Sequence, residues 1–152
     1  MVPKKLYRNT LSKLNLCAKR TNLKNFTSIL VSKKELHLFG VSSNSDCTYC
    51  GQPDSISHTF IHCHLSKQFF HKVLQHFNEE NATSFTQSDE ELLFGKFLNS
   101  VQLQRHPLQK KLNYCMLLAK YYLYNQKLNQ IEPVVNEFEK KLKFKYRVEK
   151  FI

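Results

Sequence analysis

The chain has 152 residues, of which 41% are hydrophobic and 23% are charged, so it can bury a core and is not disordered throughout. Its three glycines and four prolines are too few for a loop-rich β-sandwich, a collagenous repeat or a glycine-rich phosphate-binding loop. The composition predicts a small, basic and mainly α-helical domain, with no large sheet.

Positive charge is concentrated at the two ends of the chain. The 23 basic side chains exceed the 12 acidic ones, which gives a formal charge of +11. Residues 1–40 and 101–152 carry net charges of +8 and +7, whereas residues 41–100 are mildly acidic at −4. Because an anionic partner relieves the repulsion between like charges, we expect RNA or DNA to bind through its phosphates. A basic protein without such a partner is the alternative.

Residues 1–38 are expected to form a basic helical arm. No apolar run of the secretory type follows Met1, and no run reaches the length of about 20 residues that a membrane-spanning helix needs. Residues 1–34 lack acids, as mitochondrial transit peptides do, but those favour Arg over Lys. We predict an intracellular protein, nuclear or cytoplasmic, that enters no membrane. The expected phosphate contacts in this arm are Lys4, Lys5, Lys19, Arg20, Lys24, Lys33 and Lys34.

The cysteines carry the most specific motif. Cys47, Cys50, His58 and Cys63 follow the pattern C-x2-C-x7-H-x4-C, and the odd total of five cysteines argues against a disulfide framework. Two residues between the first two cysteines let one tight turn aim both thiolates at one ion. Gly51 stands directly after Cys50, at a position where such a turn often needs a positive φ. Four Cys and His ligands with no vacant position predict one structural, tetrahedral Zn²⁺.

The second pair of ligands is expected on a short helical segment. Residues 53–55 form a loop with a helix N-cap, so that residues 56–61 present His58 and end near Cys63. His62 lies four residues after His58, on the same face of an α-helix, and competes with Cys63 as fourth ligand; His64 is also near. Without a metal, the cysteines would be buried as small hydrophobic residues or would form a Cys–His nucleophile, for which no orienting third residue is found.

Residues 39–77 surround this motif with aromatic and aliphatic residues. The relevant runs are Phe39-Gly40-Val41, Cys47-Thr48-Tyr49-Cys50, Ser57-His58-Thr59-Phe60-Ile61-His62-Cys63, Lys67-Gln68-Phe69-Phe70 and Val73-Leu74. This pattern resembles the zinc-binding domain that lies C-terminal to the reverse transcriptase in LINE-type non-LTR retrotransposons. A weaker likeness continues at residues 91–95 and 117–124. Members of that family often have Pro after the last Cys and Trp in the next helix, where this chain has His64 and Phe70.

The resemblance implies a nucleic-acid-binding accessory domain, or a fragment of one, that works with a reverse transcriptase encoded upstream. It does not imply a polymerase, because Asp46, Asp54 and Asp89 are the only aspartates and none is adjacent to another. They cannot supply the paired carboxylates that hold two Mg²⁺ ions. We therefore predict a protein that is not an enzyme. A zinc-stapled helical adaptor that binds another protein is the alternative.

Further helices are expected after the cysteines. Residues 65–78 complete the zinc-binding segment 39–78, with Phe69, Phe70, Val73, Leu74 and Phe77 on one helical face. We expect this face to pack over the zinc loop rather than to stack on bases. Residues 79–152 are expected to form C-terminal helices packed on this segment, one starting near residue 89 and one near Pro107. The second has an apolar seam of Leu108, Leu112, Cys115, Ala119 and Tyr122.

The last segment carries two conflicting patterns. Glu137/Lys141 and Glu139/Lys143 are pairs typical of a helix, whereas residues 141–148 alternate as a strand does. We predict a helix because no second strand is found to pair with it. Its basic side chains form a second set of expected phosphate contacts, with a solvated face as the alternative: Lys141, Lys143, Lys145 and Arg147.

Overall fold

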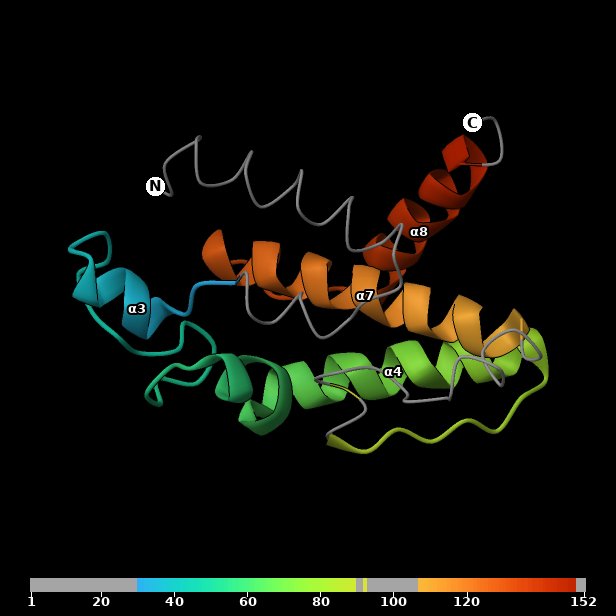
Figure 1. Ribbon diagram of the computed structural model, residues 1–152, viewed down its shortest axis with the longest axis horizontal. Helices are drawn as coiled ribbons and strands as arrows, with labels where there is room; N and C mark the ends of the chain where they lie inside the picture. Colours follow the sequence, from blue (N-terminus) through green and yellow to red (C-terminus); the bar gives the residue numbers. More distant parts are fainter. Residues whose placement is uncertain (1–29, 90–91, 93–106, 150–152) are drawn as a thin grey trace.

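Helices make up the architecture of the residues that the computed structural model describes, which are 30–89, 92 and 107–149. In chain order they are α3 (Lys33–Leu38), the single-turn π-helix η1 (His58–His62), α4 (His64–Asn81), α7 (Pro107–Leu128) and α8 (Val135–Glu149). Figure 1 shows their arrangement. Within these ranges no strand forms, and one isolated bridge joins Asp46 to Pro53. The predicted mainly α-helical fold without a large sheet is confirmed.

The amphipathic pattern after the cysteines forms α4. Phe69, Phe70, Val73 and Phe77 are buried along one face of this helix, as predicted for residues 65–78. The helix ends at Ala82, which adopts the left-handed conformation with φ 50° and donates its N–H to the carbonyl of Asn78. The aromatic face of α4 therefore belongs to the core.

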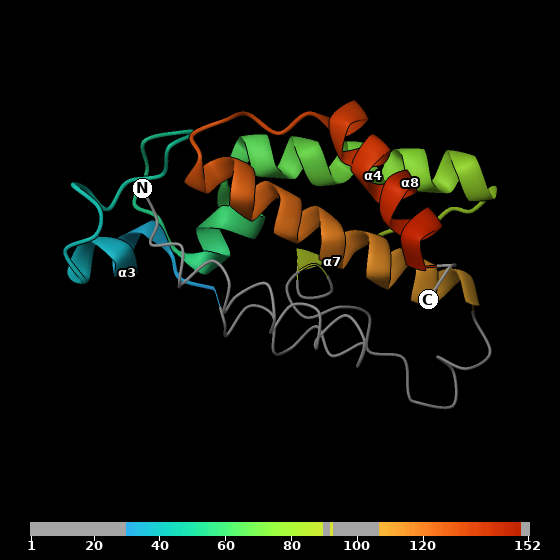
Figure 2. The same ribbon diagram turned by 90° about the horizontal axis from the view of Figure 1, so that it is seen from above.

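α7 lies beside α4 in both views (Figures 1 and 2). It begins at Pro107, where the fixed φ of proline suits the first turn, as predicted. Four members of the predicted seam are buried: Leu112, Cys115, Ala119 and Tyr122. Leu108 is exposed, so the seam starts one turn later than expected. Buried residues lie on every side of α7, which makes it the central helix of the described residues.

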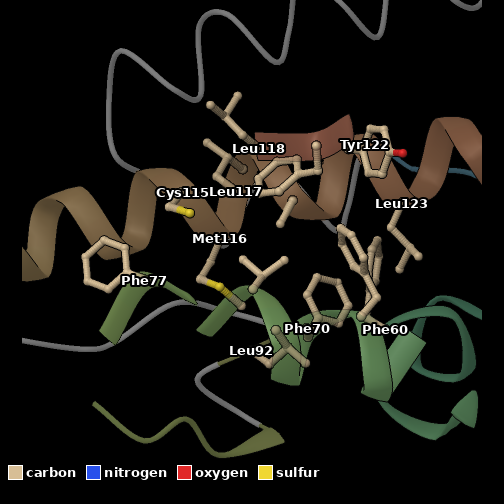
Figure 3. Close-up of a cluster of buried hydrophobic side chains, with 14 of the residues drawn as sticks. Phe60, Phe70, Phe77, Leu92, Cys115, Met116, Leu117, Leu118, Tyr122 and Leu123 are labelled. Carbon is tan, nitrogen blue, oxygen red and sulfur yellow. The ribbon is translucent and has the colours of Figure 1, made fainter. Parts of the chain in front are cut away.

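Aromatic rings join the helices at the centre of the core. The ring of Phe69 lies 5.5 Å from that of Phe70, 5.6 Å from that of Tyr122 and 5.8 Å from that of Phe138, measured between centroids. Phe60 of η1 lies 6.3 Å from Phe70 and is fully buried. Figure 3 shows how the side chains of η1, α4 and α7 meet in this cluster. Tilted and edge-on ring pairs of this kind add to the free energy of apolar burial.

The C-terminal segment is a helix, α8, and its alternating residues 141–148 do not form a strand. Phe138 is buried against the core, and two polar side-chain contacts connect α8 to α4. His76 Nδ1 contacts Glu139 Oε1, and Lys143 Nζ lies 3.7 Å from Glu80 Oε1. These tertiary contacts and the charge pairs within α8 stabilise the helix more than the alternation of residue types at 141–148 favours a strand.

Lys120 is enclosed near the middle of α7, with 1% of its surface exposed. Burial lowers the pKa of its ammonium from 10.5 to about 7. From pH 7 to 10.5 this side chain therefore holds a proton in the unfolded chain that it lacks in the folded chain, so its contribution to the free energy of unfolding rises with pH by up to about 1.4 kcal/mol per unit. Lys120→Met should remove this slope and raise stability at pH 7.5. Urea unfolding at several pH values between 7 and 10 measures both the slope and the stability.

The exposed residue Lys110, on the same helix, provides the control for this measurement. Lys110→Met should leave the pH slope of the wild-type chain unchanged. A Lys120→Met variant with the wild-type slope would contradict the prediction.

None of the described helices has both the length and the apolar composition needed to cross a bilayer.

Candidate metal centre

The loop that carries Cys47 and Cys50 is held by its own backbone. The N–H of Cys47 donates to the carbonyl of Gln52 at 2.7 Å, and the N–H of Gly51 donates to the carbonyl of Cys47 at 2.9 Å. Gly51 has a φ of +72°, which glycine adopts at little cost, so the expected positive φ is confirmed. The loop is a tight turn that presents both thiols on one side.

Ser55 begins the helical segment that carries His58. Its side-chain oxygen accepts the N–H of His58 at 3.0 Å, and its carbonyl accepts the N–H of Thr59 at 2.8 Å. The predicted N-cap in residues 53–55 is therefore confirmed.

The segment then widens into the π-turn of η1. The N–H of Cys63 donates to the carbonyl of His58 at 2.9 Å, which is an i→i+5 hydrogen bond. Such a bond brings residue i+5, rather than i+4, back over residue i. Cys63 is therefore aligned with His58, whereas His62, the ligand that an α-helix would align, is exposed.

Four donor atoms meet between the loop and the turn. One ligand atom from each of Cys47, Cys50, His58 and Cys63 lies within 4.8 Å of all the others. The Sγ atoms of Cys47 and Cys63 are 4.0 Å apart, and Cys50 Sγ is 3.1 Å from His58 Nε2. A tetrahedral ion with metal–sulfur bonds of about 2.3 Å separates its sulfurs by about 3.8 Å. The cluster thus has the dimensions and donors of a four-coordinate metal site.

The surroundings of the cluster favour negatively charged sulfur at Cys47. Burial alone would raise the pKa of Cys47, but the backbone N–H groups of Tyr49 and Cys50 and the ammonium of Lys127 lower it below its ordinary value. Burial raises the pKa of Cys50, and so do the charges of Cys47 and Cys63. A divalent cation among the sulfurs would relieve this repulsion between thiolates.

The same environment favours a neutral imidazole at His58. Burial lowers the pKa of His58, and the positive charge of Lys127 lowers it further. A metal-binding histidine must be unprotonated, so this shift suits a ligand.

A buried ion pair adjoins the metal cluster. Asp54 and Lys127, 3% and 6% exposed, form this pair across 73 positions of the chain. Thr59 completes it, because Lys127 Nζ donates to Thr59 Oγ1 at 2.7 Å and that hydroxyl donates to Asp54 Oδ1 at 3.1 Å. The second carboxylate oxygen accepts the N–H of Lys33 at 2.9 Å. The pair therefore connects the segment between the ligands to α3 and α7.

Nothing in the sequence singles out Asp54 or Lys127 for this role. Asp54 stands in a polar Pro-Asp-Ser loop and Lys127 near the basic end of the chain, so neither is distinguished locally.

Two further hydrogen bonds attach the metal loop to α7 and the residues that follow it. Tyr49 Oη donates to the carbonyl of Ile131 at 2.8 Å, and Thr48 Oγ1 donates to the carbonyl of Lys127 at 3.4 Å. The metal loop is thus attached at several points to the C-terminal end of α7.

The predicted phosphate contacts do not gather at this centre. Lys34 is exposed on α3, whereas Lys33 is half-buried beside Asp54. The helical form of α8 also divides its cations, because Lys141 and Lys145 line a groove of about 300 Å³ against α7 while Lys143 lies near Glu80 of α4. Figures 1 and 2 show α8 crossing the α4–α7 pair, well away from α3. The remaining predicted contacts of the N-terminal arm lie outside the described residues: Lys4, Lys5, Lys19, Arg20 and Lys24.

No family model matches the chain, and neither a curated protein nor a solved structure does. The function must therefore be inferred from the geometry of the cluster and from the charge of the chain.

Proposed function

We propose that this chain is a zinc-stapled, nucleic-acid-binding module of the kind that accompanies the reverse transcriptase of non-LTR retrotransposons. The observation that carries the proposal is the convergence of Cys47, Cys50, His58 and Cys63 within 4.8 Å. Thiolate and imidazole donors suit Zn²⁺, and four protein ligands leave no position for a reactive water. The ion accordingly has a structural role, and the module itself is not an enzyme.

The charge of the chain supports an anionic partner. Its formal charge is +11, although residues 41–100 are acidic. Three thiolates around one Zn²⁺ add to −1, which makes the metal loop itself unfavourable to phosphate. We assign the phosphate contacts with RNA or DNA to the basic ends of the chain, and a reverse transcriptase encoded upstream is the protein partner implied by the resemblance.

Nucleic-acid binding tests this proposal directly. The zinc-loaded chain should bind single-stranded or duplex oligonucleotides, and log K should fall by roughly 0.7–0.9 per phosphate contact for each tenfold rise in salt. Fluorescence anisotropy at several salt concentrations measures both the affinity and this slope. Undetectable binding at about 50 mM salt, where electrostatic binding is strong, would overturn the proposal.

A protein-binding adaptor is the second candidate function. The turn at the end of α3 exposes three apolar side chains, Leu38, Phe39 and Val41, close to the metal loop in sequence. Exposed apolar residues grouped in this way are typical of protein–protein contacts. An adaptor would bind no oligonucleotide at low salt, so the same measurement separates the two candidates.

A further inference from the structure

The outward face of α8 places an exposed aromatic ring among cations. Phe144 is 68% exposed, and Val148, one turn further on, is also exposed. Residues three and four positions away are its neighbours on the helix surface. These neighbours include Lys140, Lys141 and Arg147, all exposed. Phe144 is therefore flanked by positive charge on both sides along the helix.

The packing of α8 does not require this ring. Phe138 and Leu142 contact the core, and the pair of His76 with Glu139 fixes the same side of the helix to α4. Phe144 lies on the side that faces solvent, and Figure 1 shows the C-terminal half of α8 extending beyond the α4–α7 pair. Leaving a phenyl ring in water sacrifices the free energy of its burial, which an external partner can restore.

Charge complementarity identifies the chemistry of that partner. Cations around an exposed aromatic ring match a polyanion that also offers flat apolar surfaces, which describes a nucleic-acid strand. Bases in a duplex stack on one another, so a ring reaches the flat face of a base there only by paying to unstack a base step, whereas an unpaired base offers that face directly. Lys141, a neighbour of Phe144 on the helix, also lines the groove between α7 and α8, together with Lys145, Asn125, Asn129 and several apolar side chains.

We infer that Phe144 stacks on an unpaired base of single-stranded RNA or DNA while Lys140 and Arg147 contact the flanking phosphates. The inference rests on the proposed function and names the surface and the strand type that this function uses. It assigns the contact to α8, which lies well away from α3, rather than to the metal loop.

Two strands of equal charge isolate the stacking contact. We would measure binding of the full zinc-loaded chain to a mixed-sequence single strand of about 12 nucleotides and to an abasic strand of the same length. Phe144→Ala should weaken binding to the base-bearing strand by about 5- to 30-fold and leave binding to the abasic strand unchanged. Phe144→Trp should restore the affinity. Phe39→Ala, which removes another exposed ring (71%), is the matched control and should have no effect.

The cations are tested separately from the ring. Lys140→Gln with Arg147→Gln should weaken binding to both strands and reduce the salt slope by about 0.7 for each contact removed. Far-UV circular dichroism checks that each variant keeps its helices. An unchanged salt slope in a folded double variant would overturn the assignment of these two residues to phosphates.

Three further outcomes separate the inference from the proposed function. If the wild-type chain binds the single strand and Phe144→Ala binds it equally well, the inference fails and the proposed function stands. If the wild-type chain binds neither strand, both fail. If Phe144→Ala loses affinity only for vesicles of phosphatidylcholine and phosphatidylserine, the face recognises anionic lipid and the inference is overturned.

Discussion

Cys63→Ser should abolish the binding of one Zn²⁺ per chain, whereas His62→Ala should leave the ion bound. Cys63 Sγ lies 4.0 Å from Cys47 Sγ, and the π-turn aligns Cys63 with His58 while His62 is exposed. A serine hydroxyl is a poor ligand for Zn²⁺, because thiolate and imidazole are the donors this ion prefers. Native mass spectrometry measures the number of ions bound by each variant.

Loss of the ion should also be the largest single change in stability. Binding free energies of about 10–16 kcal/mol are typical of structural zinc in small peptides, and much of this energy goes into folding. Chelation should therefore unfold residues 46–63 and lower the melting temperature, and Cys63→Ser should reproduce the effect without chelator. Zinc retained in Cys63→Ser but lost in His62→Ala would transfer the fourth ligand to His62 and contradict the geometry.

Lys127→Met should cost about 3–5 kcal/mol of unfolding free energy, because it leaves the carboxylate of Asp54 buried without its cation. Asp54 is 3% exposed, so its carboxylate is largely shielded from bulk water. The double variant Asp54→Asn, Lys127→Met should recover most of the loss, since it removes both charges and keeps an acceptor for the N–H of Lys33. The double-mutant cycle compares the wild type, Asp54→Asn, Lys127→Met and the double variant, all loaded with zinc, by urea unfolding.

An exposed ion pair provides the control for this cycle. Lys143 and Glu80 are 62% and 57% exposed and 3.7 Å apart, so Lys143→Met should change stability by less than about 1 kcal/mol. If the effects of Asp54→Asn and Lys127→Met are additive, the buried residues do not act as a pair and the prediction is wrong.

Features set by neighbouring residues could be predicted from the sequence. Gly51 has the positive φ that its place after Cys50 required, and Ser55 caps the segment carrying His58. The periodic apolar residues of α4 are buried, and α7 starts at Pro107. In each case the determining interaction spans only a few residues, so the local pattern is sufficient.

Features set by distant residues could not be predicted. The partner of Asp54 lies 73 positions away, and burial of Lys120 depends on how the neighbouring helices surround α7. The sequence leaves the choice between Cys63 and His62 open, because α-helical spacing aligns His62 with His58 whereas the segment forms a π-turn. Alternation at residues 141–148 is ambiguous for a similar reason, since packing against α4 and α7 rather than periodicity decides the helix.

The short span of the metal cluster has a consequence for the order of folding. Its outermost ligands, Cys47 and Cys63, are 16 residues apart, whereas the ion pair of Asp54 and Lys127 closes a loop of 73. Closing the shorter loop loses less chain entropy, and contacts of low sequence separation form faster. We therefore expect the metal-bound segment to form first and to present Asp54 and Thr59 as a preformed docking point for the C-terminal end of α7.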